Sequence, residues 1–185
     1  MPEVTASTVI SAPREAVFDL VADLSARPAF TDHYMKDFRL ARANPSGRGA
    51  AARFLLRRRF FKDYAEISIS ECERPSRIVE EGRVGRRGRS RLSTVYDFAE
   101  ESDGTRVEVT VTSEPKTGVD RLRQRALPGW MKRQTRRALE RLRRLFEEPR
   151  DGALARATVA GSEPHTAPRF GAHVTVPGKA ATDDG

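Results

Sequence analysis

VDRLRQRALPGWMKRQTRRALERLRRLF, residues 119–146, is a stretch with many charges in which apolar residues recur at helical spacing over several turns. From Trp130 onward, apolar and small residues three or four positions apart form one broad stripe, and basic residues fill the other side. Pro128 and Gly129 separate this stripe from a shorter apolar face, because proline cannot donate its amide hydrogen and clashes with the preceding turn. We therefore predict a long C-terminal helix that packs its stripe into a core and kinks or breaks near Pro128.

The residues before this helix alternate between apolar and polar, as strands do. A first strand is predicted at residues 4–11, followed by two short helices at about 13–24 and 25–34. Six further strands are predicted at residues 35–43, 50–59, 61–71, 77–84 and 90–100, and around Val107, Val109 and Val111. Short turns such as Ser102-Asp103-Gly104 join consecutive strands. This order predicts an α+β fold in which a curved antiparallel sheet wraps around the long C-terminal helix.

Length and composition favour one domain and an appendage. The chain has 185 residues, of which 38% are apolar, which suits a single core. We expect a domain over residues 2–147 and a disordered tail over 148–185, where Pro, Gly and Ala predominate.

Several kinds of site are disfavoured by the residues present. Cys72 is the only cysteine, so an intramolecular disulfide and a cysteine metal cluster are excluded. No His, Cys or carboxylate group shows ligand spacing, and GRVGRRG at residues 82–88 is not followed by a helix start that could bind phosphate. We therefore expect no metal and no cofactor. Since neither a secretory signal nor a transmembrane segment is recognisable, we expect a cytoplasmic protein.

Three segments together resemble a known family. They are ASTVISAPREAVFDLVADL at residues 6–24, ISECERPSRIVEE at 69–81 and DFAEESDGTRVEVTV at 97–111, followed by the long basic helix. With this order of elements, the chain resembles the polyketide cyclase/dehydrase branch of the SRPBCC superfamily, also called START-like or Bet v 1-like. The resemblance implies a helix-grip fold and a cavity between sheet and helix for a lipid, polyketide or other apolar molecule. Some members are cyclases, others are carriers, and some act on ribosomes.

A curved sheet that grips one helix leaves space at one end, which apolar side chains line. We predict that the ligand-binding residues are Phe54, Leu56, Ile67, Ile69, Thr94, Tyr96, Phe98, Val109, Trp130, Met131 and Gln134. Thr94 and Tyr96 project with the apolar residues of their strand and could hydrogen-bond a ligand. The alternative is that the same side chains form a dry core.

Three functions remain open from the sequence. The first is binding of a small hydrophobic or amphipathic molecule. The second is a cyclase or dehydratase that uses Tyr96 or His33 to transfer a proton. The third is a basic module, with a net charge of +8, whose outer helix face docks on RNA, a ribosome or an anionic membrane surface. The same arginines also suit a simple solvated face.

Overall fold

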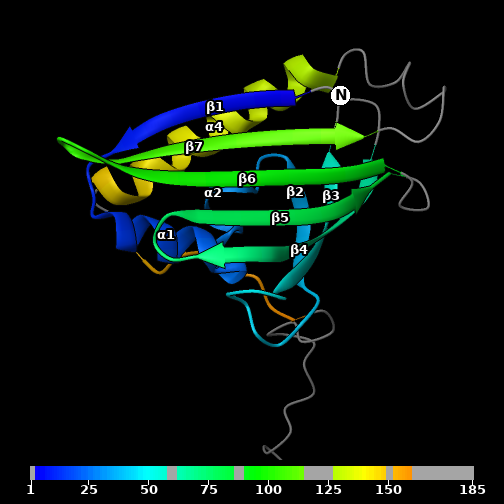
Figure 1. Cartoon of the computed structure of the whole chain (residues 1–185). Helices are drawn as coiled ribbons and strands as arrows, with labels where there is room; N and C mark the ends of the chain where they lie inside the picture. The colour runs from blue at the N-terminus through cyan, green and yellow to red at the C-terminus, as the bar shows by residue number, and fades with distance from the viewer. Residues whose placement is uncertain (1–2, 58–61, 86–89, 115–126, 149–151, 160–185) are drawn as a thin grey trace, which may run out of the picture.

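The computed structural model describes residues 3–57, 62–85, 90–114, 127–148 and 152–159 (Figure 1). The elements are β1 (Glu3–Ile10), α1 (Arg14–Ala22), η1 (Leu24–Ala26), α2 (Pro28–Thr31), β2 (Met35–Leu40), β3 (Ala51–Arg57), β4 (Lys62–Glu73), β5 (Arg77–Val84), β6 (Ser90–Glu101), β7 (Gly104–Glu114) and α4 (Leu127–Glu147). Among the described residues, the predicted order of one strand, short helices, six strands and a long helix is confirmed, and the second predicted short helix, 25–34, is divided into η1 and α2.

The strands form one antiparallel sheet with the order β1-β7-β6-β5-β4-β3-β2. The sheet curls, and α4 runs along its β1–β7 side (Figure 1). Helix α4 packs mainly against β1 and α2, whereas α1 packs against β6 and β7. The helices therefore cover the concave face of the sheet, which confirms the predicted helix-grip fold.

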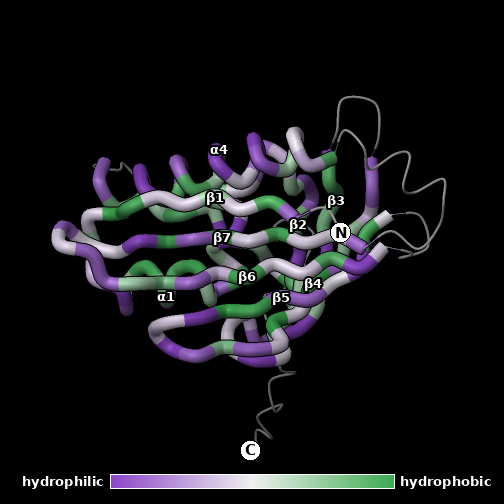
Figure 2. Tube along the Cα trace, turned by 45° about the horizontal axis from the view of Figure 1, so that its top comes forward, coloured by the Kyte–Doolittle hydropathy of each residue, from purple (hydrophilic) through white to green (hydrophobic). Residues whose placement is uncertain are grey.

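Hydrophobic and hydrophilic residues alternate along much of the strands, as the coloured tube shows (Figure 2), and the hydrophobic ones form the buried face of the sheet. In β7, Val107, Val109 and Val111 are buried. Arg106, the residue directly before Val107, is exposed. Burial of such apolar side chains stabilises the fold by roughly 1.5–3 kcal/mol each. The pattern that predicted the strands is therefore the one that directs them toward α4.

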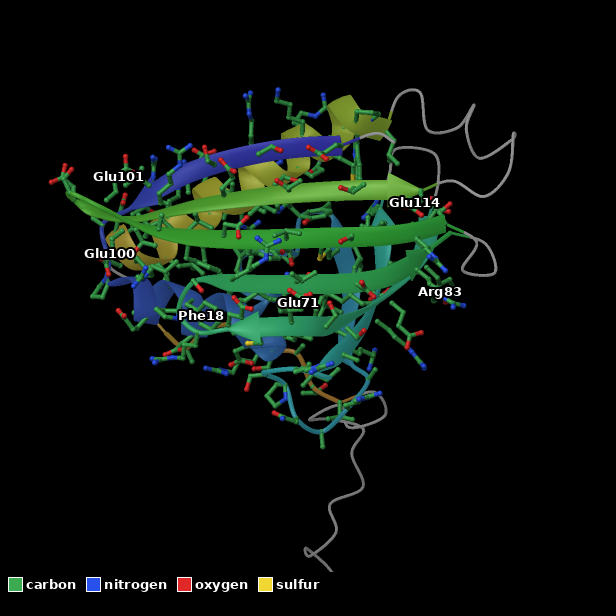
Figure 3. All side chains as sticks on the ribbon, in the orientation of Figure 1. Phe18, Glu71, Arg83, Glu100, Glu101 and Glu114 are labelled. Atoms are coloured by element: carbon green, nitrogen blue, oxygen red, sulfur yellow. The ribbon has the colours of Figure 1, made fainter. Side chains whose placement is uncertain are left out.

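Aromatic contacts join α1 to the inner face of the sheet and join strand β2 to strand β3. The rings of Phe18 on α1 and Phe98 on β6 meet edge to face, with centroids 5.3 Å apart. Phe38 and Phe54 stack with centroids 5.4 Å apart. Phe18 lies in the interior, whereas charged side chains such as Glu71 and Arg83 lie on the outside (Figure 3).

Helix α4 is continuous from Leu127 to Glu147, so Pro128 and Gly129 lie in its first turn. Proline is tolerated there because the first amides of a helix have no intrahelical acceptor. The helix assignment over Leu127–Glu147 does not test a kink or break at the boundary with residues 119–126, which therefore stays a prediction. The apolar face predicted for residues 119–126 lies outside the described residues.

The segment 152–159 lies on the domain, although disorder was predicted from residue 148 onward. It adds a parallel bridge between Val159 and Leu40 at the free edge of β2. Four hydrogen bonds hold it: Arg156 Nη1 to Asp23 Oδ2 at 2.7 Å and to Ser25 Oγ at 2.9 Å, Ala157 N to Ser25 O at 2.7 Å, and Leu40 N to Thr158 O at 2.9 Å. The packed structure thus extends beyond the predicted boundary at Glu147.

Candidate functional site

A cavity of about 40 Å³ lies between the concave face of the sheet, α2 and α4. This volume holds about one to three water molecules. It is much smaller than the roughly 300–1,000 Å³ of common small-molecule sites. Its walls are mostly apolar, and Glu80 is the one acidic side chain among the described residues that line it.

Many of the predicted ligand-binding residues do line this cavity: Phe54, Leu56, Ile67, Thr94, Tyr96, Val109 and Met131. The others lie elsewhere. Ile69 and Phe98 are buried in the core, and Phe98 contacts Phe18. Trp130 packs against the ring of Tyr34, with centroids 6.1 Å apart, and Gln134 is a half-buried residue of α4.

Further lining residues come from the short helices and from the stripe of α4. They include Phe30, Thr31, Tyr34, Thr135, Ala138, Leu139 and Leu142. The α4 members belong to the apolar stripe that the sequence shows, but periodicity alone does not separate residues beside a cavity from those in a dry core. The residues around α2 lack any periodic signal because α2 spans only Pro28–Thr31.

A buried polar cluster of Arg27, Glu80 and Tyr96 lies beside the cavity. Arg27 is fully buried, and Glu80 and Tyr96 are 2% and 7% exposed. Nη2 of Arg27 lies 2.5 Å from Oε1 of Glu80, and Nη1 lies 3.4 Å from Oε2. Nη1 also donates to the Tyr96 hydroxyl over 2.6 Å, and Nη2 donates to the carbonyl oxygen of Val21 over 3.0 Å. The guanidinium is thus held from several directions.

Local structure explains how these side chains meet. Arg27 lies between η1 and α2, where Asp23 caps η1 through the amide of Ser25 and Thr31 donates to the Arg27 carbonyl oxygen. Glu80 is two residues after the buried Ile78 on β5, so strand alternation turns it inward.

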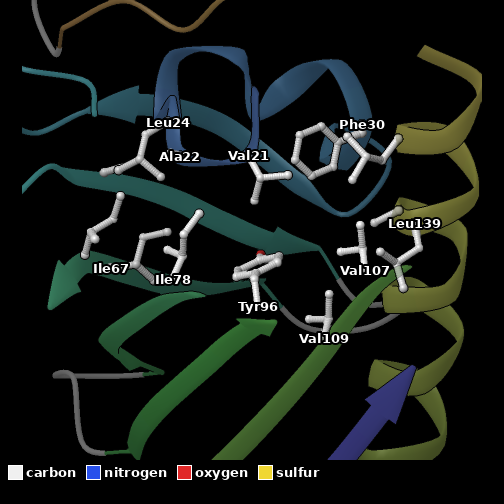
Figure 4. Packing of buried hydrophobic residues seen from close by; sticks show 14 of the residues in the cluster. Val21, Ala22, Leu24, Phe30, Ile67, Ile78, Tyr96, Val107, Val109 and Leu139 are labelled. Atoms are coloured by element: carbon white, nitrogen blue, oxygen red, sulfur yellow. The ribbon is translucent and has the colours of Figure 1, made fainter. Parts of the chain in front are cut away.

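Tyr96 comes from the neighbouring strand, β6. It pairs with Ile78 across the sheet, just as Thr94 pairs with Glu80. Figure 4 shows Tyr96 within the buried apolar cluster, with Val21, Phe30 and Val109 around it. Side chains from the η1–α2 connection, β5 and β6 therefore converge at one point.

Electrostatics keeps the cluster ionised at Arg27 and neutral at Tyr96. Burial acts to lower the pKa of Arg27, but the charge of Glu80 and the hydrogen bond to its carboxylate outweigh it and leave that pKa raised. Burial raises the pKa of Tyr96, and the nearby Arg27 charge offsets this only in part. The guanidinium also lies over the rings of Tyr96 and Phe30, 5.1 and 5.5 Å from their centroids.

One nitrogen of the Arg27 guanidinium, Nε, donates no hydrogen bond to a described residue. A buried ion pair with incomplete hydrogen bonding contributes little net stability, since desolvation of the charges is costly. A contribution to stability therefore does not fully explain the cluster, and we also consider a role in ligand binding.

His33, the other predicted proton-transfer residue, is not among the residues that line the cavity. Its ring lies 4.8 Å from that of Tyr34, centroid to centroid, and both ring nitrogens are buried. Burial lowers its pKa, and the charge of Arg141 lowers it further. Asp32, its neighbour, pairs with Arg141 over 2.7 Å.

The outer face of α4 carries two kinds of basic residue. Lys132, Arg133, Arg136 and Arg137 are exposed and form no salt bridge with a carboxylate in the described parts of the chain. Toward the C-terminal end, Arg144 instead pairs with Glu140 over 2.8 Å. The excess positive charge is thus greatest in the first half of the helix.

The curled sheet, the long helix and the cavity between them define a ligand-binding domain of the helix-grip type. The chain belongs to the family described as polyketide cyclase / dehydrase and lipid transport, whose model matches residues 1–147. This confirms the predicted membership of the SRPBCC superfamily. No curated protein matches the chain. Within the described residues, no helix is both long and apolar enough to cross a membrane.

Solved structures show the same fold. The protein TTHA0849 from Thermus thermophilus is 24% identical, with a TM-score of 0.62 over 80% of this chain and 100% of that protein. The KanY protein is 17% identical, with a TM-score of 0.64 over 78% and 97% of the two chains. Ara h 8.0201 is 12% identical, with a TM-score of 0.58 over 80% and 98%. At these identities the likeness concerns the fold alone.

Proposed function

We propose that this chain binds a compact, mostly apolar molecule with one polar end in the cavity between the sheet and α4. The observation that carries the proposal is that apolar walls converge on Tyr96, Glu80 and Thr94, beside the fully buried Arg27. Apolar walls with a few placed polar groups are the usual composition of small-molecule sites.

The size of the cavity favours a compact ligand over a lipid or a long polyketide. About 40 Å³ is free, so a molecule of more than a few atoms requires side chains to move. Met35 and Met131 line the cavity and are only half buried. Because methionine is unbranched and flexible, these two side chains are the ones we expect to make room.

Binding explains the site better than catalysis by a cyclase or dehydratase. A proton-transfer group works best when its pKa lies near the working pH. Burial moves the pKa of Tyr96 upward, away from neutrality. His33 does not face the cavity, so neither candidate residue combines a suitable pKa with a suitable position.

The test follows the methyl signals of Met35 and Met131 by NMR, using methionine labelled with carbon-13 and toluene as the added ligand. We expect both signals to shift and saturate. Ala138→Leu, which places extra atoms in the cavity wall, is expected to weaken binding, whereas Arg137→Leu on the exposed side of α4 is the control. Unshifted methionine signals, together with no small molecule in native mass spectra of protein from its own host, would refute the proposal.

A second candidate function is docking on RNA through Lys132, Arg133, Arg136 and Arg137. The observation that favours it is the absence of salt bridges to these exposed cations among the described residues. Binding that releases counterions weakens steeply as salt rises. A titration with RNA across a salt series tests it, and an affinity independent of salt rejects it. Vesicles of anionic lipid in the same series show whether a membrane surface is preferred.

A further inference from the structure

The hydroxyl group of Tyr96 has a hydrogen that no described residue accepts. Arg27 Nη1 donates to the Tyr96 oxygen over 2.6 Å, and a guanidinium can only donate. The phenol stays protonated because burial raises its pKa. Arg27 is its one hydrogen-bond partner in the described part of the chain, and Tyr96 lines the cavity. The O–H group is therefore free to donate to a molecule there.

The charges of Arg27 and Glu80 restrict the kind of ligand that can bind in the cavity. Arg27 and Glu80 face each other, with each terminal guanidinium nitrogen near one carboxylate oxygen, so their charges cancel. The other described residues around the cavity are uncharged. A ligand anion competes with Glu80 for Arg27, and a ligand cation competes with Arg27 for Glu80. Either leaves a buried charge without its partner, which is strongly unfavourable.

Polarisation strengthens the donor. Hydrogen bonds in series reinforce one another, and their electrostatic part is larger in surroundings of low dielectric constant. Arg27 donates to Tyr96, and the apolar wall beside Tyr96 includes Val109, its partner on β7. An acceptor placed at the Tyr96 hydroxyl completes this series.

From these observations we infer that the ligand is uncharged and carries a hydrogen-bond acceptor, a carbonyl or ether oxygen, that receives the Tyr96 hydrogen. This inference rests on the proposed function and adds the chemical class of the ligand. Tyr96 and Arg27 then act as one unit, in which Arg27 orients the hydroxyl and Tyr96 contacts the ligand.

The test compares two probes of nearly equal shape, cyclohexanone and methylenecyclohexane, on the full chain. We expect Tyr96→Phe to weaken the binding of cyclohexanone about fivefold to tenfold, because one hydrogen bond is lost. The affinity for methylenecyclohexane is expected to stay unchanged. The control is Tyr64→Phe, because Tyr64 is 75% exposed and on the outer face. Dissociation constants come from the methyl signals of Met35 and Met131.

A second measurement uses the wild-type protein alone, so it holds even if Tyr96→Phe does not fold. The infrared carbonyl band of bound cyclohexanone is expected to lie at lower frequency than in hexane, as hydrogen bonding requires. An unshifted band, equal weakening of both probes, or tighter binding of cyclohexanecarboxylate than of cyclohexanone overturns the inference and leaves the proposed function standing. If neither neutral probe binds the wild type, both are rejected.

Discussion

Replacing Arg27 by methionine leaves the carboxylate of Glu80 buried without its cation. The wild-type guanidinium is fully buried and makes contacts with Glu80, Tyr96 and the Val21 carbonyl oxygen. Breaking a buried pair from one side costs on the order of 3–5 kcal/mol. Since domains of this kind are stable by about 5–15 kcal/mol, we expect Arg27→Met to shift the urea midpoint strongly or to prevent folding.

The double variant Arg27→Met/Glu80→Leu shows whether the loss of stability comes from the unpaired carboxylate of Glu80. Replacing both charges with apolar side chains removes the unpaired carboxylate, so the double variant is expected to recover most of the lost free energy of unfolding. Arg53→Met is the control, because Arg53 and Glu66 form a pair with both side chains more than half exposed. Such surface pairs contribute less than about 1 kcal/mol.

The assay is equilibrium unfolding in urea at pH 7, followed by circular dichroism and by the fluorescence of the single tryptophan, Trp130. Two results refute the reasoning. One is a decrease in the free energy of unfolding of less than about 1 kcal/mol for Arg27→Met, which is the range of an exposed ion pair. The other is a double variant as unstable as the sum of the two single ones, which would mean that the charges do not interact.

Three further predictions concern other parts of the fold. The folded-state pKa of His33 lies below its usual 6.5, so the unfolded chain binds more protons near that pH. The free energy of unfolding is therefore expected to fall as the pH drops from 7 to 5, and to fall less in His33→Gln. Gly82→Ala places a Cβ 2.2 Å from the Glu66 carbonyl oxygen and is expected to lower unfolding free energy by about 1–3 kcal/mol, whereas Gly129→Ala, with open space around it, is expected to be neutral or stabilising in urea unfolding. A chain ending at Glu148 lacks the Thr158 carbonyl oxygen that binds the Leu40 amide, so hydrogen exchange at Leu40 is expected to accelerate while the Ala41 amide, bonded to Ala51, keeps its rate; equal rates at Leu40 in both chains would show that segment 152–159 does not protect it.

The cavity wall could be predicted from the sequence where strand alternation directs side chains inward. On β6, Thr94 and Tyr96 share a face with Leu92 and Phe98, and all four are buried. The prediction was less successful for Ile69, Phe98, Trp130 and Gln134. Periodicity says which face of an element is buried, but the position of a gap along that face depends on how the elements cross.

Arg27 and Glu80 show where prediction from sequence stopped. Glu80 has the parity of an inward residue, but glutamate is ordinarily solvated, and only a cation nearby explains its burial. That cation, Arg27, is 53 residues away in sequence. It lies in the connection between η1 and α2, which shows no apolar periodicity. A charged residue at an inward strand position is the one signal that could have pointed to the cluster.

The sequence by itself predicted the succession of elements, the antiparallel pairing of consecutive strands and the family, because alternation, helical spacing and turn residues are local properties of the chain. Tertiary structure decided that β1 pairs with β7, that segment 152–159 lies on β2, and that Arg27, Glu80 and Tyr96 meet beside the cavity. These depend on contacts between residues far apart in sequence. The free energy of a buried charge likewise depends on its partners, which only the folded chain brings within hydrogen-bond distance.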